Sequence, residues 1–318
     1  MSAILFEEVS LRFPGASQAA VDRCSCEVET GEFVVILGPS GCGKTTLLKM
    51  VNRLYEPTSG RISLNGRDIR QFQATHLRQQ IGYVIQQSGL FPHMTVAQNI
   101  GVVPKLLGWK NPRIQARVDE LLMLVELPPQ EFRNRYPVQL SGGQQQRVGL
   151  ARALAGDPGV MLMDEPFGAI DAITRANLQD EILRLQNQLH KTILFVSHDV
   201  EEALRLADRI LIMQAGRIVQ YDTPFHILTQ PANRFVRDLM GADDIVRQLG
   251  FLRVETAMTR LPASNGFNQP TIDRQESLRE ALSLILRTGA KKLTVLENGQ
   301  AIGLLTLEHI RDSASVKG

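Results

Sequence analysis

Residues 32–54 have the sequence EFVVILGPSGCGKTTLLKMVNRL and decide the fold of the N-terminal part of the chain. The continuous apolar run FVVIL is typical of a strand that is buried on both faces. Four apolar residues of TTLLKMVNRL recur at helical spacing. The glycine-rich loop between them, residues 38–45, fits the pattern G-x-x-x-x-G-K-[ST]. The stretch therefore predicts strand, loop and helix, the context in which this pattern binds nucleotide phosphates.

The loop supplies the groups that nucleotide phosphates require. Small residues allow backbone N–H groups to wrap the phosphates, and the helix N-terminus adds its partial positive charge. Lys44 would hold the β- and γ-phosphates of ATP, and Thr45 would bind Mg²⁺. The alternative is an ordinary glycine-rich turn, which the flanking strand and helix disfavour. We expect the phosphates to be bound by Gly38, Pro39, Ser40, Gly41, Cys42, Gly43, Lys44, Thr45 and Thr46.

An acidic pair follows a second apolar run. The sequence VMLM, residues 160–163, ends in Asp164-Glu165. Asp164 would hold Mg²⁺ directly or through water, and Glu165 would orient or deprotonate the attacking water. A solvated strand end is the alternative for such a pair on its own. The phosphate loop upstream favours the catalytic interpretation.

A second candidate anion site lies at residues 140–144, LSGGQ, which precede the helical pattern QQRVGLARAL. The N-terminus of that helix would expose Ser141 and the amides of Gly142 and Gly143 to an anion. A capped helix with a flexible start explains Ser141, but it explains neither the paired glycines nor Gln144. A single ATP pocket needs no second phosphate site, so we expect this segment to contact the γ-phosphate bound by another copy of the chain.

Taken in order, GPSGCGKTT, LSGGQ, VMLMDEP, Ala169-Ile-Asp171 and Ser197-His198 resemble the motifs of the ABC ATPases, over residues 1–240. The resemblance implies an α/β fold: a P-loop ATPase core with an antiparallel β subdomain and an inserted helical subdomain, residues 86–156. It also implies a homodimer that binds two ATP molecules head to tail. GAID stands where many members of the family have GALD.

The resemblance also assigns roles to individual residues. Phe13 would stack on adenine, Gln86 would link the Mg²⁺ site to the membrane partner, and Asp171 would lie at the dimer seam. His198, which on its own is just a polar residue at a strand end, would contact the γ-phosphate. Catalysis would then depend on Lys44, Glu165 and His198, and Mg²⁺ binding on Thr45, Gln86 and Asp164.

Longer stretches resemble the ATP-binding subunits of the quaternary-ammonium importers, which take up glycine betaine, carnitine and choline. They are IGYVIQQSGLFPHMTVAQNI, RYPVQLSGGQQQRVGLARALAGDP and MDEPFGAIDAITR. This resemblance implies transmembrane permease subunits as partners, an extracytoplasmic substrate-binding protein, and a peripheral location on the cytoplasmic face of the membrane. Amino-acid importers share much of the pattern. A soluble ABC ATPase acting on DNA or ribosomes is disfavoured, because the chain has only one ATPase unit and no room for a long coiled coil.

Composition narrows the possible functions further. The chain has 318 residues and a net charge of +2, from 35 basic and 33 acidic residues, which gives no basic footprint for nucleic acid. Cys24, Cys26 and Cys42 lack further ligands at zinc spacing, and we expect reduced thiols.

We expect no secretory signal at the N-terminus. The longest apolar runs are far shorter than the ~20 residues of a membrane span, so another chain would cross the membrane.

Residues 88–109 are unusually apolar for a surface segment. In the resembled family this region forms the groove that takes a coupling helix of the membrane subunit. Leu90, Phe91, Met94, Val96 and Trp109 are the candidate residues. For Leu90 and Val96, packing inside the helical subdomain is an equally good explanation.

The C-terminal part of the chain predicts a separate small α+β domain, residues 250–318. We expect a helix after Pro231 to Leu249, then the loop LPASNGFNQP, then strand, helix, strand, strand and helix over residues 271–313. This order resembles one CBS module. Such modules usually pair within a chain, and here there is room for one, so we expect pairing between subunits. The domain would regulate transport in response to ionic strength or a nucleotide, or would only support dimerisation.

Overall fold

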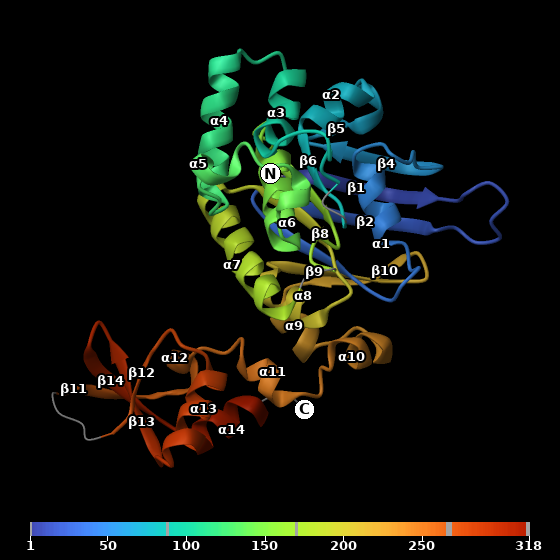
Figure 1. The fold of residues 1–318 in the computed structure, drawn as a ribbon. Helices are drawn as coiled ribbons and strands as arrows, with labels where there is room; N and C mark the ends of the chain where they lie inside the picture. Colours follow the sequence, from blue (N-terminus) through green and yellow to red (C-terminus); the bar gives the residue numbers. More distant parts are fainter. Residues whose placement is uncertain (1, 87–88, 169–170, 265–268, 316–318) are drawn as a thin grey trace. The chain divides into compact units, whose positions relative to one another are not determined.

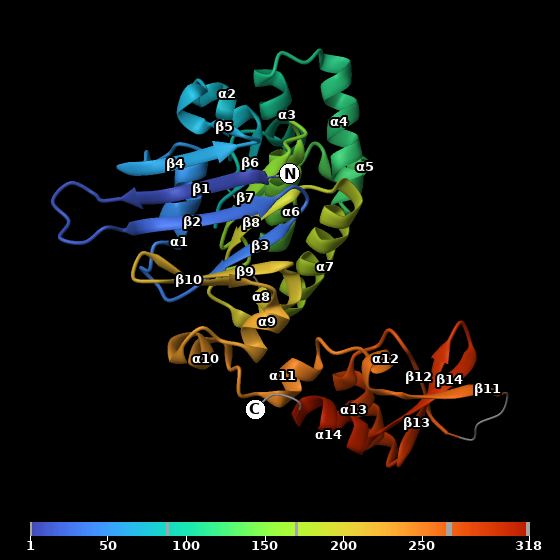
Figure 2. The ribbon, with the colours of Figure 1, turned by 180° about the vertical axis from the view of Figure 1, so that it is seen from behind.

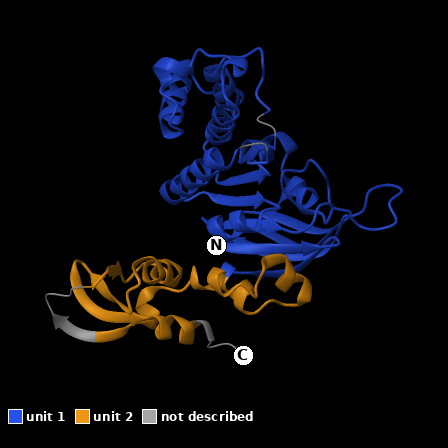
Figure 3. Cartoon of the chain, turned by 60° about the horizontal axis from the view of Figure 1, so that its bottom comes forward, with its two compact units in different colours: residues 1–224 blue, residues 225–318 orange. Residues whose placement is uncertain are grey.

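The computed structural model describes residues 2–86, 89–168, 171–264 and 269–315. The chain forms two compact units, residues 1–224 and 225–318, which Figure 3 colours separately. The second unit begins before the predicted end of the ATPase domain at residue 240, because the helices after Pro224 contact the next helix of the chain. Gln248 donates to the carbonyl of Leu228 at 3.5 Å, and Arg247 donates to that of Met240 at 2.8 Å.

A six-stranded sheet forms the centre of the first unit, in the order β10-β9-β3-β8-β7-β6 (Figure 1). Its strands are parallel except β10, which pairs antiparallel with β9. β3, β8 and β7 carry almost only buried side chains, as expected where helices cover both faces. α1 and α7 lie on opposite sides of this sheet (Figures 1 and 2). The bounds are β3 (Phe33–Leu37), β6 (Ile81–Val84), β7 (Val160–Asp164), β8 (Thr192–Val196), β9 (Arg209–Gln214), β10 (Arg217–Asp222), α1 (Lys44–Val51), α7 (Ala172–Leu189) and α8 (Val200–Leu206).

These elements confirm the parallel α/β sheet predicted from the sequence. The apolar runs at 160–163, 192–196 and 209–213 are strands, and the stretches at 172–190 and 200–207 are helices. The run before the phosphate loop is a buried strand, and the helix after the loop ends slightly earlier than its apolar pattern suggested.

A second, antiparallel sheet completes the β structure of the first unit, in the order β2-β1-β4-β5. Buried residues of this sheet, of α1 and of the central sheet belong to one hydrophobic core, which fixes α1 and the loop before it from both sides. The elements are β1 (Ser2–Leu11), β2 (Val21–Glu29), β4 (Ser59–Leu64) and β5 (Arg67–Asp68), followed by a 3₁₀ turn (Ile69–Gln71) and α2 (Ala74–Gln79).

The segment from residue 86 to the start of β7, the strand that ends in the acidic pair, is mainly helical, as predicted. It contains α3 (Val96–Leu106), α4 (Asn111–Leu124), α5 (Pro129–Phe132), a 3₁₀ turn (Pro137–Gln139) and α6 (Gly142–Leu154). Val96 is fully buried, so core packing accounts for it. Leu90 is half-buried, and Phe91 is 40% exposed. Ser88, the first residue of the predicted coupling groove, lies outside the described residues.

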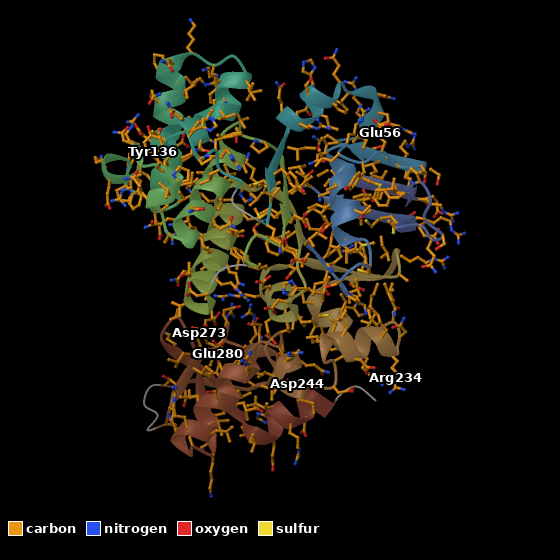
Figure 4. The ribbon with its side chains drawn as sticks, turned by 45° about the vertical axis from the view of Figure 1, so that its right-hand side comes forward. Glu56, Tyr136, Arg234, Asp244, Asp273 and Glu280 are labelled. Carbon is orange, nitrogen blue, oxygen red and sulfur yellow. The ribbon has the colours of Figure 1, made fainter. Side chains whose placement is uncertain are left out.

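The second unit contains a four-stranded sheet in the order β11-β14-β13-β12. All five elements predicted for residues 271–313 are present. The side chain of Glu280, labelled in Figure 4, completes a capping box with Ser277 at the start of α13. The bounds are α9 (Pro224–Thr229), α10 (Arg234–Met240), α11 (Ile245–Leu249), α12 (Val254–Ala257), β11 (Thr259–Ser264), β12 (Thr271–Asp273), α13 (Leu278–Thr288), β13 (Lys292–Glu297), β14 (Gln300–Thr306) and α14 (Leu307–Ser315).

Two expectations for this unit are wrong. The single helix expected up to Leu249 is two helices, because Gly241 takes a left-handed conformation (φ 59°) that ends α10, and Asp244 then caps α11. The first residues of LPASNGFNQP are not a loop, since they belong to β11, which pairs with β14. The middle of that stretch, 265–268, lies outside the described residues. Across the part of the chain that is described, no helix has both the length and the apolar character of a membrane span.

Candidate active site

The phosphate loop joins the end of β3 to the start of α1, as its sequence predicts. Gly38, Gly41 and Gly43 all have positive φ, at 152°, 77° and 108°. A Cβ atom on Gly38 would lie 2.3 Å from the carbonyl oxygen of Met213, and one on Gly43 would lie 2.4 Å from that of Ala20. The loop is therefore held against β9 and the segment before β2 by contacts that only glycine permits.

Lys44 is 6% exposed, although it carries a charge. Its ammonium donates to the carbonyls of Gly38 at 2.7 Å and Pro39 at 3.0 Å, so it is held directly over the loop. Cys42 is also buried, and that burial raises the pKa of its thiol despite the neighbouring Lys44. The thiol therefore stays protonated near neutral pH, which argues against a reactive role for it.

Thr45 and Asp164 meet although they are far apart in the sequence. The Thr45 hydroxyl donates to Asp164 Oδ1 at 2.7 Å, and both residues are half-buried. The parallel sheet brings them together, because both β3 and β7 end at the same edge. A hydroxyl and a carboxylate oxygen are the ligand types that Mg²⁺ prefers.

Gln86, Glu165 and His198 converge at the same edge. Glu165 Oε2 lies 3.4 Å from Gln86 Nε2 and 3.3 Å from His198 Nδ1. The three residues follow β6, β7 and β8, which are neighbours in the sheet. The strand order therefore explains why three separate motifs form one cluster around a carboxylate.

The LSGGQ segment forms the N-terminus of α6. Ser141 and Gln144 make a capping box, in which each side chain accepts a hydrogen bond from the other residue's backbone N–H, at 3.0 and 3.3 Å. A Cβ on Gly143 would lie 2.6 Å from the Thr174 side chain, so this glycine allows α6 and α7 to approach. Capping and packing thus explain more of the motif than we expected. Gly142 faces open space and, like Ser141, is exposed.

Asp171 and Phe13 are each held by a local contact. Asp171 caps α7 by accepting a hydrogen bond from Thr174 N at 3.0 Å, and this bond lowers the pKa of its carboxyl. Ala169 and Ile170 of the same motif lie outside the described residues. Phe13 is 38% exposed and packs edge-to-face on Tyr55, with ring centroids 5.2 Å apart. Its exposed ring is available for stacking.

Sequence reasoning missed Tyr55, Gln146 and Glu202, which support these groups, and it gave Ser197 no role of its own. Tyr55 backs Phe13, and Gln146 donates to the carbonyl of Gln86 at 3.1 Å, tying α6 to the cluster. Ser197 and Glu202 bond to each other beside His198. Tyr55 and Gln146 are far from their partners in the sequence, whereas Glu202 is only five residues from Ser197 and carries no local pattern that marks its burial.

Comparison with known proteins identifies the family. Residues 21–168 match the model of the family described as ABC transporter. The chain is 47% identical over 317 residues to the glycine betaine/carnitine/choline transport ATP-binding protein OpuCA of Bacillus subtilis, covering 98% of this chain and 81% of that one. The chain belongs to the ATP-binding proteins of ABC transporters. A sulfate/thiosulfate import ATP-binding protein of Gloeobacter violaceus is also 47% identical, over 242 residues, 75% of this chain and 68% of that protein.

A solved structure confirms the fold of this ABC ATP-binding protein. The dimeric, post-hydrolysis structure of an ATP-binding cassette bound to ADP and Pi matches it with a TM-score of 0.62 and 31% identity, covering 70% of this chain and 98% of that chain. The α/β ATPase fold predicted from the motifs is therefore confirmed. The prediction that the chain is an ABC-type ATPase is confirmed as well.

Proposed function

We propose that this chain is the ATP-hydrolysing subunit of an importer for quaternary ammonium osmoprotectants. One observation supports this cargo more than any other. The relative named for glycine betaine, carnitine and choline matches 98% of the chain, whereas the equally identical sulfate importer subunit matches only 75%. The C-terminal residues are therefore shared with the osmoprotectant relative. The partners would be transmembrane permease subunits, with an extracytoplasmic substrate-binding protein acting through them at the membrane.

ATP would bind along the loop at the end of β3. Phe13 would stack on adenine, and the amides of the glycine-rich loop would hold the phosphates. The ammonium of Lys44 now bonds to two loop carbonyls, so it is already desolvated and poised where the β- and γ-phosphates would lie. Binding would exchange those carbonyls for phosphate oxygens, which are stronger partners.

The residues of the site fit Mg²⁺. Thr45 Oγ1 and Asp164 Oδ1 are 2.7 Å apart, near the separation of about 2.9 Å between adjacent ligands of an octahedral ion. The side-chain oxygen of Gln86 would be a third ligand. In the described part of the chain no three His, Cys, Asp or Glu side chains cluster to hold a metal, so phosphate oxygens would supply further ligands. When bound, the ion would neutralise charge on the transferring phosphate.

Glu165 would orient or deprotonate the attacking water. Gln86 and His198 both approach Oε2 of its carboxylate, while no bond to Oε1 occurs among the described residues. One oxygen is thus fixed and the other can accept a proton from water. His198 would also contact the γ-phosphate, so it would sense whether ATP or ADP is bound.

Two copies would act together as a homodimer. Ser141 and Gly142 are exposed at the N-terminus of the 13-residue helix α6, where backbone amides and the helix dipole favour an anion. We propose that they contact the ATP held by Lys44 of the other copy, with Asp171 at the seam. The solved cassette that this chain resembles is itself dimeric. ATP binding would close the dimer, closure would move the permease, and hydrolysis would reopen it.

The second unit would regulate transport. We propose that residues 250–318 form a single CBS-like module, with the helical subdomain (86–156) and the rest of the ATPase domain (1–240) before it. The mixed sheet of β11 to β14 with α13 and α14, and a core of its own, support an independent module. Its signal would be ionic strength or a nucleotide.

Uptake measurements test the proposed cargo. In cells that carry this chain with its permease and binding protein, labelled glycine betaine, choline and carnitine should be taken up, and uptake should rise with osmolarity. Glu165→Gln is the control, and it should abolish uptake. If none of the three is taken up while ATPase activity is intact, the cargo is wrong, and amino acids become the next candidates.

A further inference from the structure

The side chain of His198 is 63% exposed, so little surrounds the ring itself. Its Nδ1 lies 3.3 Å from Oε2 of Glu165, a carboxylate oxygen that also lies 3.4 Å from Gln86 Nε2. The direction of such a ring depends on the backbone on either side of it. Here that backbone is the short segment of Ser197 to Asp199, between β8 and α8.

A buried carboxylate holds this segment. Ser197 is 2% exposed and Glu202 is 7% exposed. The Ser197 hydroxyl donates to Glu202 Oε2 at 2.6 Å and accepts from Asp199 N at 2.9 Å. Burial raises the pKa of Glu202, which shows that the carboxylate lies in a costly place. The hydrogen bond from Ser197 offsets part of that cost, so the two residues depend on each other.

The same carboxylate connects to α7, the helix that Asp171 caps. Glu202 Oε1 lies 3.4 Å from Gln179 Nε2 and 3.9 Å from Arg175 Nε. Arg175 also lies 3.5 Å from Asp199 Oδ2. Its backbone N–H donates to the carbonyl of Asp171 at 2.9 Å. The segment that carries His198 is therefore tied to the first turns of α7.

We propose that Glu202 is a positioning residue for hydrolysis: by holding Ser197, it fixes the place of the His198 ring beside Glu165. The proposal rests on the proposed function, in which His198 contacts the γ-phosphate. Arg175 extends the same connection to Asp171, so a movement of α7 at the dimer seam reaches His198 through these contacts.

Two substitutions separate the hydrogen bond from the bulk of the side chain. Glu202→Leu has nearly the same volume but accepts no hydrogen bond from Ser197, and we expect kcat to fall about tenfold or more because misplaced groups lose much of their effect. Glu202→Gln keeps an acceptor oxygen and should fall only about threefold. The KM for ATP should change less than about twofold in both variants, because Glu202 does not contact the loop that binds the phosphates.

A double-variant cycle distinguishes positioning from general damage. In a His198→Ala background, Glu202→Leu should cause no further fall in kcat, because there is no ring left to position. The same factor in both backgrounds would mean that Glu202 acts on the fold rather than through His198, and the proposal would be overturned.

A measurement without catalysis gives a second test. The imidazole C–H signal of His198, identified by its loss in His198→Ala, should shift in Glu202→Leu and in Ser197→Ala. The signal should stay in place in Glu181→Gln. That variant removes another buried carboxylate, which belongs to α7 rather than to α8. An unmoved signal with unchanged kcat in Glu202→Leu and Ser197→Ala refutes the positioning role alone. Wild-type kcat in His198→Ala refutes instead the proposed function of His198.

Discussion

Glu165 has a backbone conformation that its side chain disfavours. Its φ is 47°, in the left-handed region, which costs a non-glycine residue ~1–2 kcal/mol. Two bonds hold it there: its N–H donates to the carbonyl of Val196 at 3.1 Å, and Gly168 N donates to its carbonyl at 3.2 Å. The turn directs the carboxylate toward Gln86 and His198. The strain thus lies where the chemistry requires a carboxylate in a fixed place.

Glu165→Gln tests the role that this geometry suggests. The amide keeps the shape of the side chain but cannot take a proton, so kcat should fall by ~10²-fold or more while ATP still binds. Because closure is proposed to follow binding, ATP should trap the variant as a dimer on size-exclusion chromatography. Adding Ser141→Arg should remove the ATP-induced dimer, since it blocks the exposed start of α6. Wild-type turnover in Glu165→Gln would remove Glu165 from catalysis.

Most residues of the cluster were predictable from sequence, because each belongs to a short motif at the end of a strand. Thr45, Asp164 and Glu165 meet because parallel strands end at one edge, which the alternation of strands and helices already implied. Glu202 was not predictable. Its partner Ser197 belongs to the motif Ser197-His198, but nothing in the local sequence marks the Glu202 carboxylate as buried.

At the scale of elements, α6 and α7 meet around a buried charge. Glu181 of α7 is 5% exposed, and its Oε2 lies 3.3 Å from Arg147 Nε of α6. Neither carboxylate oxygen has a hydrogen bond among the described residues. Burial raises the pKa of Glu181 to about 7, although Arg147 opposes the shift. Glu181 therefore changes its protonation state near neutral pH, within the contact between α6 and α7.

The free energy of unfolding should reflect this proton. Because the pKa rises from its usual 4.5 to about 7 on folding, Glu181 favours the folded state below pH 4.5, and this contribution is lost as pH rises through about 7. A pKa rise from 4.5 to about 7 corresponds to a loss of about 3 kcal/mol. Thermal melts at pH 5 and pH 8 should show a smaller difference for Glu181→Gln than for the unmodified chain. Equal differences would show that Glu181 does not titrate in this range.

Element boundaries were less predictable than the elements themselves. The pattern after Pro231 indicated one helix, although Gly241 followed by the Asp244 cap is a signal for two. β11 was missed because its strand character comes from pairing with β14 rather than from an apolar run. Residues 271–313 were predicted correctly because their strands and helices carry clear periodicity.

At the scale of the whole chain, the proposed ATP site lies within one of the two units. The first unit carries every residue of the proposed ATP site, and the second has a separate core that includes Leu249, Val254 and Leu278. A relative with a different named cargo matches only 75% of the chain, whereas the osmoprotectant relative matches 98%. Hydrolysis and its control are therefore expected to be separable by truncation.

A deletion of residues 243–318 tests that separation. The cut lies after α10 because α11 places Leu249 in the core of the second unit, and a later cut would expose it. The truncated chain should keep ATPase activity within about twofold, since no residue of the site is removed. Uptake should persist but lose its rise with osmolarity, measured with labelled glycine betaine against the full-length chain. Unchanged activation by osmolarity would refute a regulatory second unit. Loss of dimers together with loss of uptake at every osmolarity would instead identify it as a support for dimerisation, because paired ATP sites need two copies.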